Sequence, residues 1–408
     1  MSLASDRATA MATAIAGNLA APPSVTDDRD RCLAQSLAKG AAGVALLHIE
    51  RARNGLAGWD TAHAWLKAAA GGDISAADDA GLFAGAPAVA FAVRAAGAGR
   101  YTQALAKLDA RVAALAHRRA SQAQARIDSG IMPPLAEFDL IYGLTGIGAY
   151  LLRSDPGGSA LEHVLRYLVR LTEPLRDDGQ MLPGWWTSHD PSFKYSPGFA
   201  GGHANFGIAH GIAGPLALLA LAASNGVTVD GQDQAIGRIC AWLDAWRQDH
   251  GTGSWWPQWV TRADLRARRP AQPGPLRPSW CYGTPGLARA QQLAGIATGD
   301  TMRQDTAERA LAGCLSDPGQ SARITDASVC HGWAGMFQAA WHAARDARTP
   351  AITNSLAHLA DQVTEHGRPG AGDGTGFLVG DAGLALVLHG IACGTPPATG
   401  WDACLLIC

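Results

Sequence analysis

Two cysteines and a histidine, Cys281, Cys330 and His331, are the residues of this chain best suited to hold a metal ion. Cys281 lies two residues before Gly283, and the Cys330-His331 pair directly precedes Gly332. Both glycines begin the same motif, two small residues three apart ahead of an apolar run, so the two positions are expected to converge. Two thiolates and one imidazole are the ligands of a catalytic zinc site, because a closed structural site normally recruits a fourth protein ligand. We predict one Zn²⁺ ion per chain.

A zinc ion with two thiolate ligands is electron-rich, and an open fourth position accepts a group from solution. Its most useful task is to bind an incoming thiol and to lower the pKa of that thiol from about 8.5, so that the thiolate dominates. The predicted metal site therefore indicates activation of a substrate thiol. An adjacent cysteine and histidine are by themselves a weak sign of metal binding, and the repeated motif strengthens it.

His210 and Asp139 are candidates for proton transfer. His210 directly precedes Gly211, and Asp139 lies four residues before Gly143, so both belong to further copies of the same motif. A histidine that binds no metal can move a proton near neutral pH, and a nearby carboxylate can set its tautomer. Two structural alternatives stay open: His210 satisfied by backbone carbonyls, and Asp139 as a residue that favours a helix N-terminus through the helix dipole.

Arg277 and Tyr282 flank Cys281 and complete the candidate site. Arg277 lies four residues before the cysteine in a proline-bounded loop, where a cation can stabilise a developing oxyanion. Tyr282 can donate a hydrogen bond from beside the metal. The alternatives are a solvated arginine on the rim and a tyrosine packed in the core.

The motif occurs seven times and predicts the fold. Each apolar run is typical of a buried helix, and the segments between them, such as residues 104–115 and 161–171, are amphipathic and typical of outer helices. One buried and one half-buried helix cannot cover their own apolar surface, so neighbouring copies must stack. The copies begin at Gly40, Gly85, Gly143, Gly211, Gly283, Gly332 and Gly380.

We predict an all-α fold, a seven-fold α/α toroid in which residues 1–408 form a single domain. A closed ring is favoured over an open solenoid because the first and last copies keep the small-residue pair and the apolar run, whereas open arrays end in atypical polar caps. The glycines would begin the inner helices and let backbones crowd together at one mouth. Ala88 replaces the second glycine of copy two. Copies one, two and seven carry no ligand set and are expected to be scaffold.

The two longest intervals between copies contain the least helical segments, residues 181–199 in one and residues 254–259 and 268–278 in the other. Their proline and glycine content excludes a long regular helix. Long loops in compact domains are commonly functional, and these carry aromatic side chains suited to holding a peptide. The alternative is that they are lids packed on the rim of the ring.

Composition narrows the possible partners. The 408 residues carry a formal net charge of −2 and only 17% are charged, so no basic field is available for nucleic acid. No stretch reaches the roughly 20 charge-free apolar residues that span a bilayer, and the N-terminus lacks a signal-peptide pattern, so a cytoplasmic protein is expected.

Eight cysteines are too sparse for a disulfide scaffold. Those outside the site are expected to be small buried hydrophobes: Cys32, Cys240, Cys314, Cys393, Cys404 and Cys408.

These motifs resemble the lanthionine synthetase C-like family, the LanC cyclases. The resemblance rests on Trp-Cys-Tyr-Gly-Thr-Pro-Gly at 280–286, Cys-His-Gly-Trp-Ala-Gly at 330–335, residues 205–214 and the terminal Trp401-Asp402 pair. It implies a seven-fold α/α toroid with zinc held by the two cysteines and the histidine of these motifs. It also implies proton-transfer roles for His210 and Asp139, and a site lined by Arg277, Trp280 and Tyr282.

The resemblance further implies a reaction. Cyclases of this family join a cysteine of a dehydrated precursor peptide to a dehydroalanine or dehydrobutyrine by Michael addition, which makes (methyl)lanthionine rings. A separate dehydratase partner is then expected, and the chain could associate peripherally with a membrane-bound biosynthetic complex. Some members carry a β-rich extension, but residues 99–130 are expected to be helical here, so leader-peptide recognition would be built differently. Whether His210 removes the thiol proton, protonates the enolate or does both stays open.

Other functions remain as alternatives. A LanC-like enzyme that adds glutathione to dehydroamino acids in proteins would show the same motifs. A non-catalytic zinc-containing peptide-binding scaffold is disfavoured, because such a scaffold would tolerate the loss of the site residues. A prenyltransferase would need a basic diphosphate pocket, and a glycosidase would need a second carboxylate beside Asp139.

Overall fold

Seven helices begin at the seven small-residue pairs. The computed structural model describes residues 3–24, 26–97, 99–251 and 253–408. In six copies the first glycine is the residue that precedes the helix, and in copy four the helix begins two residues after Gly211. These inner helices are α3 (Ala41–Arg53), α5 (Ala86–Ala95), α8 (Leu144–Ser154), α10 (Ala213–Ser224), α13 (Thr284–Thr298), α16 (Trp333–Asp346) and α18 (Asp381–Cys393).

A second layer of helices covers the inner one. Helix α9 is typical, because Leu161, Val164 and Leu168 are buried against the ring while Glu162 is exposed. The expected helix within residues 99–130 is confirmed as α6. The outer helices are α1 (Leu3–Asn18), α4 (Trp59–Ala69), α6 (Thr102–Asp128), α9 (Ser159–Leu171), α11 (Gln232–Ala245), α14 (Thr301–Leu315) and α17 (Leu356–His366).

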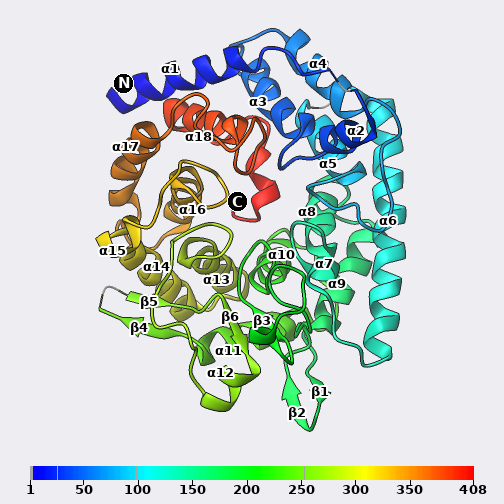
Figure 1. Cartoon of the computed structure of the whole chain (residues 1–408), viewed down its shortest axis with the longest axis vertical. Coiled ribbons are helices and arrows are strands. Elements are labelled where there is room, and N and C mark those ends of the chain that lie inside the picture. Colours follow the sequence, from blue (N-terminus) through cyan, green and yellow to red (C-terminus); the bar gives the residue numbers. More distant parts are fainter. Residues whose placement is uncertain (1–2, 25, 98, 252) are drawn as a thin grey trace.

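The inner helices form a closed ring (Figure 1). Each contacts the next in chain order, and α18 returns to contact α3. The outer partner of α18 is α1, so the first helix of the chain covers the last inner helix. The predicted all-α, seven-fold α/α toroid is therefore confirmed. One hydrophobic cluster runs through all seven copies, in keeping with the single domain that we predict for residues 1–408.

The remaining elements are short and lie in the intervals between helices. The strands pair antiparallel as β1 (Leu175–Asp177) with β2 (Gln180–Leu182), β3 (His203–Asn205) with β6 (Trp259–Thr261), and β4 (Gln248–His250) with β5 (Gly253–Trp255). The short helices are α2 (Asp28–Ala34), α7 (Leu135–Phe138), α12 (Arg262–Ala267), α15 (Pro318–Ser321), η1 (Pro197–Phe199), η2 (Thr353–Ser355) and η3 (Trp401–Leu405).

The second glycine of each pair allows the inner helix to approach the loop before it. A Cβ atom on Gly146 would lie 2.1 Å from the carbonyl oxygen of Leu140, six residues earlier, and one on Gly335 would lie 2.0 Å from that of Val329. The same contact, at the same separation of six residues, recurs at Gly43, Gly214, Gly286 and Gly383. Backbone crowding at one mouth is thus the physical reason for the motif.

Those same loops are joined to one another around the ring by backbone hydrogen bonds, which we call the backbone belt. The ring has seven junctions between copies, and at six of them an N–H of one copy donates to a carbonyl of the next. One of these six bonds runs from copy seven back to copy one. The donor–acceptor pairs are Leu37 to Phe83, Leu140 to Ala209, Ile208 to Cys281, Cys281 to Cys330, Cys330 to Leu378 and Leu378 to Ala38, with N···O distances of 2.8–3.2 Å. The belt links the loops that carry the candidate site residues.

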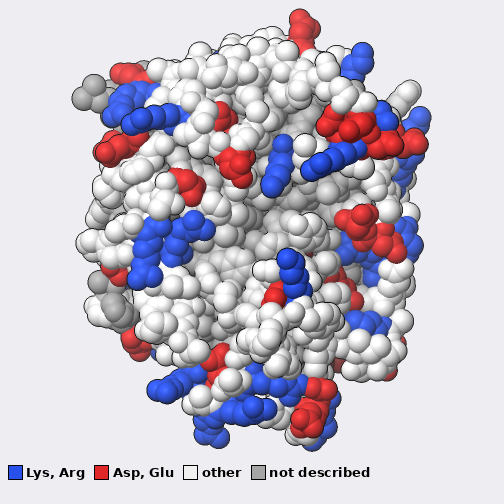
Figure 2. Space-filling view, viewed as in Figure 1, with Lys and Arg blue, Asp and Glu red and all other residues white. Residues whose placement is uncertain are grey.

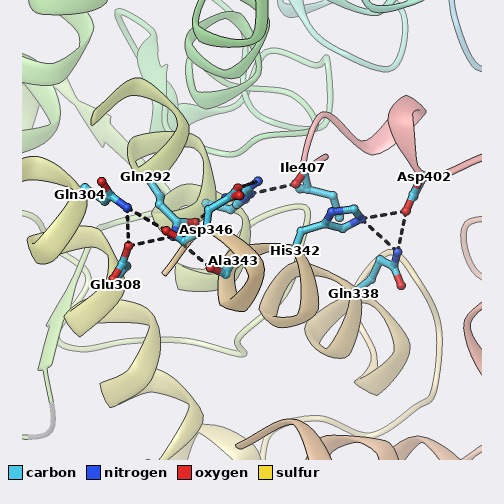
Figure 3. A network of polar contacts seen from close by, with 10 residues as sticks. Gln292, Gln304, Glu308, Gln338, His342, Ala343, Asp346, Asp402 and Ile407 are labelled. Carbon is cyan, nitrogen blue, oxygen red and sulfur yellow. Dashed lines mark hydrogen bonds and ion pairs between the residues drawn. The ribbon is translucent and has the colours of Figure 1, made fainter. Parts of the chain in front are cut away.

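The C-terminal segment returns into the centre of the ring, where Figure 1 marks the C-terminus. Asp402 accepts hydrogen bonds from His342 Nε2 at 2.8 Å and Gln338 Nε2 at 2.9 Å, both on α16 (Figure 3). Arg289 on α13 donates to the carbonyl of Ile407 and belongs to a buried polar network that continues through Gln292, Glu308 and Gln304. Residues from several inner helices therefore fix this segment. Within the described residues, no helix has the length and apolar character to cross a membrane.

Candidate active site

Cys281 and Cys330 lie on adjacent links of the backbone belt. The N–H of Cys281 donates to the carbonyl of Cys330 at 3.2 Å, and the two thiols are hydrogen-bonded to each other. Cys281 is 8% exposed and Cys330 is partly exposed, and neither forms a disulfide. The belt therefore brings together two thiols that are 49 residues apart in the sequence.

The surroundings of the thiols favour one thiolate. The hydrogen bond from Cys330 lowers the pKa of Cys281 against the opposing effect of burial, and Ser279, His331 and Arg277 act in the same direction. The pKa of Cys330 is raised well above its usual value because its thiol donates to Cys281 and is buried. A cation or metal at this position would meet a negatively charged sulfur.

His331 is held by a carboxylate that the sequence analysis did not identify. Its Nδ1 lies 3.0 Å from Asp326 Oδ2 and 3.2 Å from Ser328 Oγ. Burial alone would raise the pKa of Asp326, but the hydrogen bonds from His331 and Ser328 hold it below its usual range. A carboxylate on one ring nitrogen is the usual support of a metal-binding histidine, and it leaves Nε2 for a metal. The only sequence signal for Asp326 is its place five residues before His331.

Two cysteines and one histidine are chemically suited to zinc, but their side chains are not arranged as a metal-binding site in this structure. Among the described residues, no three histidine, cysteine, aspartate or glutamate side chains are grouped closely enough to hold a metal. The two sulfurs pair with each other, and the imidazole is aligned by Asp326. The predicted ligands Cys281, Cys330 and His331 thus share one region, and zinc binding stays a prediction.

His210 and Asp139 meet directly, as the sequence predicts. His210 Nδ1 lies 2.6 Å from Asp139 Oδ2, and the carboxylate is fully buried while the histidine side chain is 22% exposed. The other oxygen of Asp139 accepts the N–H groups of Tyr142 and Gly143 at 2.6 and 2.8 Å, at the start of α8. One oxygen of Asp139 therefore holds the turn that leads into α8, and the other orients the imidazole.

Three aromatic rings surround His210. The ring centres of Tyr142, Phe193 and Tyr282 lie 5.8, 5.6 and 6.2 Å from that of the histidine. The hydroxyl of Tyr282 accepts a hydrogen bond from Asn205 Nδ2 at 2.9 Å, and burial raises the pKa of this phenol. Tyr282 is thus packed and also keeps a proton that it can donate.

Arg277 and Trp280 differ in how well they fit a site role. Arg277 is partly exposed, and its guanidinium lies 3.9 Å from Asp326 and close enough to lower the pKa of both thiols. Trp280, which the family resemblance implies as a residue lining the site, is fully buried, and its indole N–H donates to the carbonyl of Leu405 in the C-terminal segment.

A cavity of about 180 Å³ lies beside His331. Copy six contributes Asp326, Ala327 and Ser328 to its lining, and copy seven contributes a second wall. The residues from copy seven are Ala371, Gly372, Asp373, Val379, Gly380 and Leu384. Copy seven supplies no candidate metal ligand, but its loop forms the second wall of the cavity beside His331.

The loop over residues 183–202 is packed on the ring and also exposes aromatic side chains. Trp185 and Trp186 are buried against the ring, while Phe193 and Tyr195 are 40% and 84% exposed. His189 Nε2 accepts the N–H of Leu135 at 3.1 Å and so ties this loop to α7, which leads to Asp139. Of the exposed aromatic side chains, Phe193 lies beside His210, and a peptide-binding role for this loop stays a prediction.

The surface shows charges of both signs (Figure 2). The recess at the centre of the face in Figure 2 is formed mainly by uncharged side chains, and charged groups lie mostly around it. Basic side chains gather at the lower edge, where α12 and the residues after it carry the exposed Arg266, Arg268 and Arg269.

Comparison with known proteins places this architecture and these motifs in a family. Residues 32–406 match the family described as lanthionine synthetase C-like protein. The chain belongs to this family. The nisin biosynthesis protein NisC of Lactococcus lactis subsp. lactis is 26% identical over 264 residues, which are 63% of this chain and 61% of that protein. The solved structure of a nisin cyclase superposes with a TM-score of 0.75 at 21% identity, covering 98% of this chain and 97% of that one.

Membership of the lanthionine synthetase C-like family confirms the resemblance that the motifs indicated. The chain spans about three-fifths of the length of the curated relative that it matches, and the structural likeness at this identity establishes the fold. In this member of the family, the motifs of copies four, five and six occupy successive links of the backbone belt.

Proposed function

We propose that this protein is a lanthipeptide cyclase, which closes thioether rings by adding a cysteine thiol of a dehydrated precursor peptide to a dehydroalanine or dehydrobutyrine. The observation that carries the proposal is the convergence of a paired-thiol cluster, Cys281 and Cys330 with His331, and an oriented acid–base pair, His210 and Asp139, on adjacent links of one belt. The similarity to a nisin biosynthesis protein supports the same conclusion.

Cys281, Cys330 and His331 would hold a zinc ion. When bound, the metal supplies an open coordination position at which a substrate thiol loses its proton near neutral pH. Asp326 aligns the His331 ring through Nδ1 and leaves Nε2 as the metal-binding nitrogen. Arg277, close to both sulfurs, offsets the negative charge of the thiolates.

His210 is the proposed proton carrier. Its Nδ1–H donates to Asp139, which leaves Nε2 as the nitrogen that accepts and returns a proton. Addition forms a bond between the substrate sulfur and the β-carbon, and negative charge develops on the carbonyl oxygen of the resulting enolate. The thiol proton passes to His210 Nε2, and a proton returns to the α-carbon, so the addition is balanced without a further reactant. Tyr282 keeps a hydroxyl proton with which to stabilise the enolate oxygen.

This chemistry requires a dehydrated peptide as substrate and an enzyme that produces it. The exposed Phe193, which lies beside His210, and Tyr195 on the same loop would contact the peptide. Dehydroamino acids must be made before this step, so a separate dehydratase acts upstream. We place the reaction in the cytoplasm, with possible peripheral attachment to a membrane-bound biosynthetic complex.

The decisive experiment incubates the purified, zinc-loaded protein with a dehydrated precursor peptide that contains cysteine. Free thiols are counted by alkylation and mass spectrometry, and ring formation is located by fragmentation. We expect one thiol to be lost for each ring formed. If no precursor loses thiols although the protein holds one zinc per chain, the cyclase proposal is wrong.

A parallel reaction tests the glutathione alternative. Here the peptide carries dehydroalanine but no cysteine, and glutathione is the only thiol. Addition of glutathione at a rate equal to or above that of ring closure would favour an enzyme that modifies dehydroamino acids in proteins. Zinc binding without either reaction would favour the peptide-binding scaffold.

A further inference from the structure

The backbone belt is irregular at one junction, between copies two and three. Within residues 80–85 and 139–143, all of which the structure describes, no N–H of copy two donates to a carbonyl of copy three. The two loops are nevertheless in close contact, because a Cβ on Gly81 would lie 2.9 Å from the carbonyl oxygens of both Ile141 and Tyr142. Copy two is also the copy with Ala88, and its Gly85 has a positive φ of 74°.

Arg119, from the outer helix α6, occupies this junction. Its Nη1 donates to the carbonyls of Ala80 in copy two, at 2.9 Å, and Tyr142 in copy three, at 2.7 Å. Its Nη2 donates to the carbonyl of Ala136 on α7 at 2.8 Å. The arginine is 8% exposed. A planar guanidinium with five donors suits three converging carbonyls, whereas an ordinary N–H has only one donor.

The same carbonyls belong to the segment that orients His210. Tyr142 donates its N–H to Asp139 and stacks on the His210 ring, and Ala136 lies in the short helix that ends just before Asp139. Arg119 thus grips this segment on both sides of Asp139. The carboxylate in turn receives Nδ1–H of His210 at 2.6 Å.

We infer that Arg119 is a positioning residue for the acid–base pair, replacing the missing link of the belt and setting the orientation of His210 through Asp139 and Tyr142. It does not touch the substrate. The part of this inference that concerns turnover rests on the proposed cyclase function, and the part that concerns the His210 ring does not.

The test compares Arg119→Met and Arg119→Lys with the unchanged protein. Nitrogen-15 NMR of His210 reports whether the ring is held as the Nδ1–H tautomer, and this measurement needs no substrate. We expect Arg119→Met to show mixed tautomers and a fall in kcat of about 10- to 100-fold at nearly constant KM and zinc content, because small misplacements of a catalytic group cost up to about 100-fold. Arg119→Lys should recover part of the single-tautomer NMR signal and part of kcat, since an ammonium group can still bridge two carbonyls.

Arg94→Met is the matched control. Arg94 joins the same two copies through Asp109 and Tyr150, further along α8 and away from Asp139. We expect it to lower the melting temperature but to leave the His210 tautomer and kcat unchanged. The inference is overturned if Arg119→Met keeps a single Nδ1–H tautomer, or if Arg94→Met changes the tautomer as much. If Arg119→Met does not fold, the same two outcomes are read from Arg119→Lys. If Arg119→Met shows mixed His210 tautomers but the unchanged protein forms no rings, the cyclase proposal is rejected and the positioning role of Arg119 stands.

Discussion

Besides the His331–Asp326 pair next to the thiols, two further histidine–aspartate pairs lie in different surroundings. His210 and Asp139 lie 2.6 Å apart at the mouth of the ring, and the histidine side chain is 22% exposed. His342 and Asp402 lie 2.8 Å apart inside the ring, with side chains only 4% and 2% exposed. In the inner pair, Gln338 also donates to Asp402, so the same carboxylate oxygen accepts hydrogen bonds from two side chains.

The difference shows that the pair itself does not define a catalytic site. The outer histidine keeps a nitrogen that can reach a substrate, whereas the inner one is enclosed and fastens the C-terminal segment to α16. A carboxylate fixes the orientation of a histidine in both cases, and solvent access decides whether the histidine can exchange a proton. The predictions below separate these roles.

The largest effect is expected from His210→Ala. Removing the proton carrier should lower the rate of ring formation by about 10²–10⁴-fold, the usual range for general acid–base catalysis. The melting temperature and the zinc content should change little, because Asp139 still accepts the N–H groups of Tyr142 and Gly143. Rate, thermal unfolding and metal analysis are measured on one preparation. Loss of zinc would instead identify His210 as a ligand and refute the assignment.

The inner pair should respond in stability rather than in rate. Asp402→Ala leaves His342 and Gln338 without their shared acceptor, and breaking a buried polar pair costs about 3–5 kcal/mol. Urea unfolding measures this loss, and kcat of the folded fraction is expected to stay within about twofold. A large fall in kcat with unchanged stability would give Asp402 a catalytic role and remove the contrast between the pairs.

Asp139→Asn divides the two tasks of that residue. The amide oxygen can still accept the N–H groups of Tyr142 and Gly143, but the amide NH₂ can donate to His210 Nδ1 and so favour the wrong tautomer. We expect a fall in kcat of about 10²-fold with a change in stability below about 1 kcal/mol. Asp139→Ala should add a loss of about 1–3 kcal/mol, because the N–H groups of Tyr142 and Gly143 lose their acceptor. Equal kcat values for Asp139→Asn and the unchanged protein would show that tautomer control is unimportant.

The last prediction concerns the pH dependence of stability, at a buried histidine with no carboxylate partner. His203 donates from Nδ1 to the carbonyl of His189, its Nε2 has no partner, and burial lowers its pKa to about 4. The unfolded chain, with a pKa of about 6.5, therefore binds a proton before the folded protein does. Stability should fall by about 1.4 kcal/mol per pH unit between pH 6.5 and 4 on account of this residue. His203→Gln should flatten that slope in urea titrations, and an unchanged slope would contradict the assignment.

Much of the architecture could be predicted because its cause is local. The second glycine of each pair meets a carbonyl only six residues earlier, so the motif records the crowding within a short stretch of chain. The thiols, His331, His210 and Asp139 could be grouped because they keep fixed offsets from these glycines. Asp326 and Arg119 escaped prediction because neither keeps such an offset. The hydrogen bond from Trp280 to the C-terminal segment could not be predicted either, since it joins residues 125 positions apart.

The sequence by itself determined the seven inner helices, their amphipathic partners and the residue types that gather at one mouth. These features depend on glycine spacing and apolar periodicity, which involve residues only a few positions apart in the chain. Only the tertiary structure decided that α1 covers α18, that the C-terminal segment fills the centre, and that a guanidinium from α6 closes the belt. These contacts join residues far apart in the chain and depend on closure of the ring. Closure also decides which of two similar histidine–aspartate pairs remains open to solvent.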